Sequence, residues 1–239
     1  MRQLELGGLT VRIGGGTDGD GGGDGPAVVL MHGFGAPGTD PMPFAQEIPS
    51  PVGTRWIFPE APLLLPPELG GGGGRAWWMI DVMKLQMAMM TGQLRDLTKE
   101  EPEGMAEVNA KVNAMLDELT ETLSIPEGQL VLGGFSQGAM LACDVALRSE
   151  RPLAGLVLMS GTYLAEDVWT PLMERREGLA VLQSHGRQDP LLPFSLAEKL
   201  RDAFVTAGLE VTWVPFDGGH GVHPMVITAA GDLLAQTLG

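Results

Sequence analysis

Short, continuously apolar segments recur along this chain of 239 residues and alternate with longer amphipathic ones. Apart from Gln129 and Thr212, these segments are apolar throughout: residues 27–31, 56–58, 129–132, 156–159, 179–182 and 211–214. A run that is apolar at every position is typical of a strand buried on both faces, whereas a half-exposed strand alternates. We therefore predict an α/β protein whose mainly parallel central sheet is covered by helices on both faces.

The amphipathic segments predict the helices. In residues 101–123, apolar side chains recur at steps of three and four, with acidic residues and a lysine between them. Residues 196–204 and 225–238 predict two further helices, and residues 2–13 predict a strand or hairpin. Neither an internal repeat nor a break in composition marks a second domain, so we expect residues 1–239 to form a single domain.

One stretch combines a strand, a sharp turn and a helix. After the apolar run 129–132, the sequence Gly134-Phe135-Ser136-Gln137-Gly138 fits the G-x-S-x-G pattern of a nucleophile elbow. A side chain two positions before or after a serine in such a strained turn would collide with the backbone, and glycine removes that collision. The turn also directs the backbone amide of Gln137 toward the place where an oxyanion would form. We interpret Ser136 as a nucleophile.

A second amide donor is expected in another loop. The apolar run 27–31 ends in His32-Gly33-Phe34-Gly35. Hydrolases with a nucleophile elbow take their second oxyanion donor from a backbone amide after an early strand, and the amide of Phe34 is the candidate. We interpret His32 as a structural histidine bonded to backbone rather than as a catalytic one.

A serine nucleophile needs a base and an acid that orients the base, in the chain order Ser, Asp or Glu, His. Asp189 lies in the loop after residues 179–182, and His220 lies in the loop after residues 211–214. Both loops follow the C-terminal ends of predicted parallel strands, which is where the sites of open α/β sheets lie. Ser136, Asp189 and His220 are therefore the predicted catalytic residues.

Other residues compete for these roles. Asp217 is a rival acid, but it shares a loop with the histidine. His223 is a rival base, but it directly precedes Pro224, a residue type common at the first helical position, so we expect it near a helix cap. His220 lies in the glycine-flanked part of the loop and is favoured. His185 lies near the site, on the loop of the acid itself.

Residues 14–25 are almost entirely glycine and aspartate, which invites a calcium-binding interpretation. The EF-hand pattern fails because Gly22 stands where a third ligand should be and no glutamate follows at the right distance. We expect a mobile loop. The four histidines show no zinc-binding spacing, so neither a metal nor another cofactor is expected.

The composition of the chain limits the kinds of partner that it is expected to bind. A net charge of −15 argues against nucleic acid and against stable association with anionic membranes. The single cysteine, Cys143, excludes an internal disulfide and is expected to be a small buried hydrophobe on the helix after the elbow. No secretory signal or membrane-spanning run is visible. We expect a cytoplasmic monomer or homodimer acting on a small molecule.

Residues 63–100 are rich in tryptophan and methionine, as suits an adaptable wall for an acyl chain or a lid. Core packing explains the same composition equally well. The side chains expected to bind an acyl group are Leu65, Trp77, Trp78, Met87 and Met90.

Several of these motifs together resemble one family. Residues 133–139 and 32–35, His185-Gly186 with Asp189-Pro190, and Gly219-His220 are similar to the phospholipase/carboxylesterase family of α/β-hydrolases. That family includes bacterial carboxylesterases and acyl-protein thioesterases. Residues 58–62 and 76–78 resemble its Pro-x-Ala-Pro and Ala-Trp-aromatic segments, so the resemblance spans about residues 27–238.

The resemblance implies the α/β-hydrolase fold and the triad Ser136, Asp189 and His220, with the amides of Phe34 and Gln137 as the oxyanion hole. The chain departs from the family pattern in its glycine/aspartate segment, in residues 70–74 and in the methionine-rich residues 83–90. Because these segments flank the acyl pocket in family members, substrate identity transfers least well.

We predict a serine carboxylesterase that hydrolyses short-to-medium acyl esters through an acyl-enzyme. The alternatives are a thioesterase or lysophospholipase with the same triad, and a non-catalytic binding protein with a hydrolase fold. The presence of all three triad residues and both elbow glycines disfavours the last of these.

Overall fold

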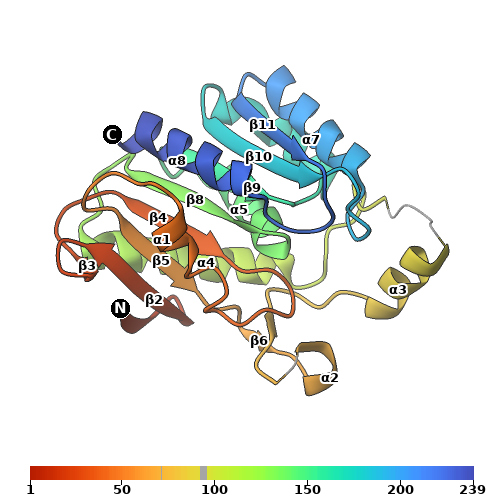
Figure 1. Cartoon of the computed structure of the whole chain (residues 1–239), viewed down its shortest axis with the longest axis horizontal. Helices are drawn as coiled ribbons and strands as arrows, with labels where there is room; N and C mark the ends of the chain where they lie inside the picture. Colours follow the sequence, from red (N-terminus) through yellow and green to blue (C-terminus); the bar gives the residue numbers. More distant parts are fainter. Residues whose placement is uncertain (71, 92–95) are drawn as a thin grey trace.

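A twisted sheet runs through the middle of the molecule in the computed structural model, which describes residues 1–70, 72–91 and 96–239 (Figure 1). Nine of the described strands form it in the order β1-β2-β5-β4-β8-β9-β10-β11, with β3 paired to β2. They are β1 (Arg2–Leu6), β2 (Leu9–Gly16), β3 (Asp20–Gly22), β4 (Ala27–Met31), β5 (Arg55–Pro59), β8 (Leu130–Phe135), β9 (Gly155–Met159), β10 (Ala180–Gly186) and β11 (Glu210–Phe216). Every pairing from β5 to β11 is parallel, while β1–β2 and β2–β5 are antiparallel. The predicted mainly parallel sheet is confirmed.

Helices cover both faces of this sheet (Figure 1). Helices α4 (Met105–Leu123), α5 (Gln137–Arg148), α6 (Glu166–Met173) and α7 (Phe194–Thr206) pack on one face. Helix α8 (Pro224–Leu238) and the short helix α1 (Phe44–Glu47) pack on the other. A 3₁₀ turn, Glu174–Arg176, follows α6 directly.

The central strand β4 shows why its sequence is apolar throughout. Val29 and Met31 belong to the core beneath α4 to α7, whereas Val28 and Leu30 belong to the core beneath α8. Successive side chains of a strand point to opposite faces, so both sets must be apolar when both faces are covered. The continuous run in the sequence is a direct consequence.

Two local features differ from the sequence prediction. Helix α4 begins at Met105 rather than near residue 101, because Pro102 precedes it and Gly104 adopts a φ of 84° at its N-cap. The glycine/aspartate segment, predicted to be a loop, contains the end of β2, a turn at residues 17–18 and strand β3, and its mobility stays a prediction. In it, the Asp18 carboxylate accepts hydrogen bonds from the amides of Gly22 and Asp20, each 2.8 Å long, and these bonds lower the pKa of Asp18.

The described part of the segment between β5 and α4 adds a second, smaller sheet and further helices to this architecture. It contains a small hairpin, β6 (Leu63–Leu64) with β7 (Arg75–Ala76), and the helices α2 (Pro67–Gly70) and α3 (Val82–Thr91). Figure 1 shows α2 at the lower edge of the view and α3 at its right-hand edge, both away from the sheet. That this segment acts as a lid or pocket wall stays a prediction, and part of it, residues 71 and 92–95, lies outside the described residues.

Candidate active site

Ser136 lies in the turn between β8 and α5 with φ 54° and ψ −117°, a conformation that L-residues adopt at an energetic cost. The neighbouring glycines make this turn sterically feasible. A Cβ on Gly134 would lie 2.6 Å from the carbonyl oxygen of Met31, and a Cβ on Gly138 would lie 2.2 Å from the same atom. The turn between β8 and α5 therefore packs directly on the end of β4 and leaves no room for a side chain at either glycine.

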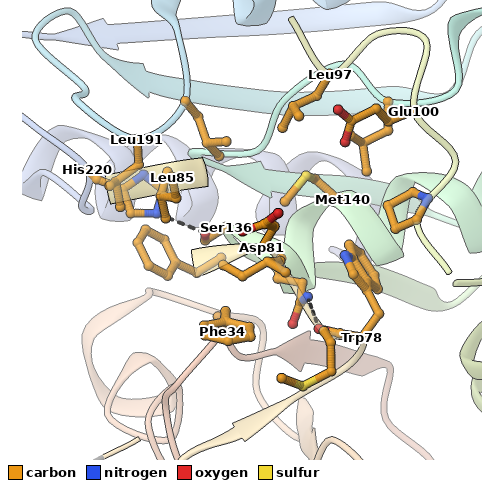
Figure 2. Close-up of a pocket in the computed structure, with 18 of the residues that line it drawn as sticks. Phe34, Trp78, Asp81, Leu85, Leu97, Glu100, Ser136, Met140, Leu191 and His220 are labelled. Atoms are coloured by element: carbon orange, nitrogen blue, oxygen red, sulfur yellow. Dashed lines mark hydrogen bonds between the residues drawn. The ribbon is translucent and has the colours of Figure 1, made fainter. Parts of the chain in front are cut away.

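His220 connects the serine to a buried acid. Its Nε2 atom is 2.8 Å from Ser136 Oγ (Figure 2). Its Nδ1 atom is 2.7 Å from Asp189 Oδ2. The imidazole also packs on the Phe135 ring, with centroids 5.0 Å apart. The three residues come from the loops that follow the parallel strands β8, β10 and β11; β10 and β11 are neighbours in the sheet, and β9 lies between β8 and β10. The geometry is that of a nucleophile, a base and an orienting acid.

Asp189 is held as a carboxylate. Its side chain is fully buried, and its second oxygen, Oδ1, accepts hydrogen bonds from the amides of Leu191 and Leu192 at 2.8 and 3.0 Å. Burial by itself raises the pKa of Asp189, but hydrogen bonds from His185, His220 and the Leu192 amide outweigh it and bring that pKa well below its usual range. Asp189 is therefore ionised at neutral pH and can act as the negative partner of a protonated His220.

The competing residues lie in other environments. The Asp217 side chain is 88% exposed and lies 3.6 Å from Arg187. His223 caps α8, where its Nδ1 atom accepts a hydrogen bond from the Met225 amide at 3.3 Å. His223 thus lies at a helix cap, as predicted. Asp217 is exposed, whereas Asp189 is the buried carboxylate that contacts His220.

His32 is structural, as predicted. Its ring is buried, Nδ1 donates to the Gly33 carbonyl at 2.8 Å, and Nε2 accepts from the Ala61 amide at 3.1 Å. Burial lowers the pKa of His32, which favours the neutral ring that this hydrogen-bond pattern requires. Cys143 is also buried, as expected for a small hydrophobe on α5.

The two expected oxyanion donors lie beside Ser136. Gln137 is the first residue of α5, so its amide is among the N–H groups that lack an intrahelical acceptor. The loop that carries Phe34 packs against the elbow, since a Cβ on Gly33 would be 3.4 Å from the Ser136 Cβ. Phe34, Gln137 and Ser136 all line the same cavity.

This cavity has a volume of about 620 Å³ and a largely apolar wall. Figure 2 shows Ser136 near its centre, with His220 and Leu191 to one side and Met140 and Leu97 toward the other. Further apolar lining comes from Trp78, Leu85 and Leu164. Charged side chains also line it: Asp40, Asp81, Lys84, Glu100, Glu101 and Glu103. An apolar cavity beside a nucleophile fits an acyl group.

Four of the five side chains predicted for the acyl pocket lie elsewhere. Trp78 lines the cavity, but Leu65 and Trp77 are buried in the protein away from it. Met87 and Met90 are 65% and 89% exposed.

The reason for the exposed methionines is helical geometry. Leu85 on α3 faces the cavity, and Met87 and Met90 follow it by two and five positions, which places them on the opposite side of the helix.

Sequence reasoning missed most of the true lining. Met140 is four residues after Ser136 and therefore one helical turn along α5 on the same side, a spacing that the sequence does show. Leu191 and Leu192 directly follow the loop of the acid. Leu97 and Leu164 carried no recognisable signal.

Comparison with known proteins places the chain in a family. Residues 23–237 match the phospholipase/carboxylesterase family. The chain belongs to this family. An acyl-protein thioesterase 1 from Cryptococcus neoformans is 28% identical over 187 residues, which cover 74% of this chain and 72% of that protein. The acyl-protein thioesterase 1 of Eremothecium gossypii is 28% identical over 210 residues, covering 85% and 84% respectively.

Solved structures of esterases have the same fold as this chain. Esterase PE8 superposes with a TM-score of 0.77 at 25% identity, covering 96% of this chain and 99% of that one. A Bacillus cereus carboxylesterase has the same fold, with a TM-score of 0.72 at 19% identity and coverage of 96% and 94%. This member of the phospholipase/carboxylesterase family therefore has the α/β-hydrolase fold, and it is a hydrolase of the esterase or thioesterase type.

The described part of this family member lacks two kinds of feature. No cluster of three or more His, Cys, Asp or Glu side chains in that part of the chain is arranged to hold a metal ion. None of the helices found there combines the length and the apolar character that crossing a bilayer requires.

Proposed function

We propose that this hydrolase is a serine carboxylesterase that acts on short-to-medium acyl esters, with Ser136, His220 and Asp189 as its catalytic triad. The observation that carries the proposal is the pair of short contacts made by His220, 2.8 Å to the serine oxygen and 2.7 Å to the buried carboxylate. A histidine bonded in this way can take the proton of the serine and is oriented while it does so.

In the acylation step, Ser136 Oγ attacks the ester carbonyl while its proton passes to His220 Nε2. The amides of Phe34 and Gln137 would donate hydrogen bonds to the oxyanion of the tetrahedral intermediate. Protonated His220 then gives its proton to the leaving alcohol as the C–O bond breaks. In the second step, His220 takes a proton from water, which attacks the acyl-enzyme. Protonated His220 then returns that proton to Ser136 Oγ as the bond to the acyl carbon breaks and the carboxylic acid leaves.

The carboxylate of Asp189 supports both steps. Because its pKa is well below the usual range, it stays negative and stabilises the imidazolium that forms on His220. Its hydrogen bonds from the amides of Leu191 and Leu192 hold the carboxylate in place.

The thioesterase reading is the second candidate. The curated relatives are named acyl-protein thioesterase, and a thioester would react through the same serine, base and oxyanion donors. A panel of matched esters and thioesters of graded acyl length separates the two by their ratio of kcat/KM. A cytoplasmic location, a monomeric or homodimeric state and the absence of stable membrane binding stay predictions from the sequence.

The decisive test is covalent labelling. A fluorophosphonate should add once per chain at Ser136, and Ser136→Ala should lose the adduct and reduce kcat by about 10⁴-fold or more. Intact-protein and peptide mass spectrometry locate the adduct. Labelling at another residue, or full activity in Ser136→Ala, would contradict the proposed mechanism.

A further inference from the structure

Trp77 was expected in the acyl pocket, but it lies behind the loop that carries the proposed oxyanion donor. Its indole Nε1 donates a 2.8 Å hydrogen bond to the carbonyl of His32, two residues before Phe34. The ring also packs against the His32 imidazole, with centroids 5.3 Å apart. Trp77 is 1% exposed and does not line the cavity, so substrate contact does not explain this arrangement.

The same short segment also holds the far side of that loop. The amide of Gly35 donates to the Arg75 carbonyl at 2.8 Å, and the amide of Arg75 donates to the Ala36 carbonyl at 3.1 Å. The backbone of Phe34 therefore lies between two anchors, the Trp77 indole at His32 and the Arg75 backbone at Gly35 and Ala36.

The second proposed donor is tied to this segment as well. The Gln137 side chain accepts a 2.9 Å hydrogen bond from the Trp77 amide through Oε1 and donates a 2.8 Å bond to the Trp78 carbonyl through Nε2. Gln137 is buried, so these bonds form away from solvent. Residues 75–78 thus connect the loop of Phe34 to the residue whose own amide is the other donor.

We infer that Trp77 is a positioning residue that sets the separation of the Phe34 and Gln137 amides. This inference rests on the proposed function, because it concerns the oxyanion hole of that mechanism. Oxyanion donors are effective only where they meet the charge that develops in the transition state, so a displaced loop lowers kcat more than it weakens substrate binding.

Trp77→Phe removes the indole donor and should lower kcat about tenfold, with KM changed by less than about threefold. Replacing Trp77 with 3-benzothienylalanine, in which sulfur takes the place of the N–H, keeps the ring volume and should give the same loss. Trp169→Phe is the matched control, because the Trp169 indole is also buried and donates a 2.8 Å bond, to Asp144, and neither residue lines the cavity. This control should keep kcat near the wild-type value.

A pair of inhibitors gives a readout that a purely structural role would not move. A trifluoromethyl ketone forms a tetrahedral adduct with an oxyanion, whereas the matching methyl ketone mimics only bound substrate. Both Trp77 variants should weaken the first by about tenfold, in proportion to the loss in kcat, and leave the second nearly unchanged.

The failures can be told apart. If the fluorophosphonate does not label Ser136 in the wild-type protein, the proposed function fails and this inference falls with it. If the wild-type protein is labelled but the Trp77 variants bind the trifluoromethyl ketone as tightly as wild type, the positioning role alone is wrong. An equal loss of kcat in Trp169→Phe would also overturn it, since the cause would then be general destabilisation.

Discussion

His185 Nε2 lies 3.2 Å from Asp189 Oδ2, the same carboxylate oxygen that His220 Nδ1 contacts at 2.7 Å. The His185 ring is fully buried, and Nε2 also lies 2.9 Å from the Leu192 carbonyl. Because a carbonyl only accepts, Nε2 carries the proton, and His185 is a donor to the acid rather than a base. Two imidazoles therefore share one carboxylate oxygen.

We expect His185→Leu to lower kcat/KM several-fold and to reduce the free energy of unfolding by about 1–3 kcal/mol, because a buried carboxylate loses a donor. His185→Gln can place an amide N–H near the same oxygen and should recover part of both losses. Steady-state kinetics and urea unfolding measure the two effects. Equal behaviour of the leucine and glutamine variants would show that the hydrogen bond contributes nothing.

Asp189 should make the stability of the protein sensitive to acid. Its folded pKa lies below the unfolded value of about 3.9, so near and below that pH the unfolded chain binds more protons than the folded one. The stabilisation is complete above the unfolded pKa and is lost as pH falls toward the folded pKa. The difference in unfolding free energy between wild type and Asp189→Asn should therefore shrink below about pH 4. Asp217→Asn, at an exposed acid, is the control, and a difference that grows in acid would contradict the expectation.

Substitutions of His220 and His223 should differ strongly in their effect on activity. His220→Ala should lose activity by about 10⁴-fold, since it removes the imidazole that contacts the serine oxygen and takes its proton. His223→Ala should keep most of its activity and lose about 0.5–2 kcal/mol of stability, because it removes a cap of α8. Kinetics and thermal unfolding of both variants provide the test. The reverse ranking in activity would move the base to His223.

Met140 should limit the length of the acyl chain. It lines the cavity from α5 and is 8% exposed, so Met140→Ala opens apolar space there. Each added methylene that fills a dry wall contributes about 0.8 kcal/mol, or roughly fourfold in kcat/KM. We expect the best ester to become longer in Met140→Ala, whereas Met87→Ala, at an exposed position, leaves the profile unchanged. Kinetics on p-nitrophenyl esters of graded length decide, and an unmoved profile in Met140→Ala would exclude Met140 as the end of the pocket.

Several parts of this protein were readable from the sequence because they depend on neighbouring residues. The run at residues 27–31 predicted a strand buried on both faces, and β4 is one. The two glycines around Ser136 predicted a turn too tight for side chains, and the contacts with Met31 show why. His223 before Pro224 predicted a helix cap. Each of these is a local requirement of the backbone, so contiguous residues are enough to encode it.

Tertiary structure alone decided which side chains face the cavity. Trp77 and Trp78 are adjacent and chemically alike, yet only Trp78 lines it, because the Trp77 ring packs against His32 and donates to the His32 carbonyl. On α3 the sequence shows a face rich in methionine, but not which face turns toward the site. The role of His185 as a second donor to Asp189 also depends on tertiary structure. The sequence placed His185 near the acid, whereas its contact with Asp189 Oδ2 depends on how the chain returns after β10. An apolar pattern shows which side chains favour burial, and only the docking of that element shows whether they are buried and against which residues.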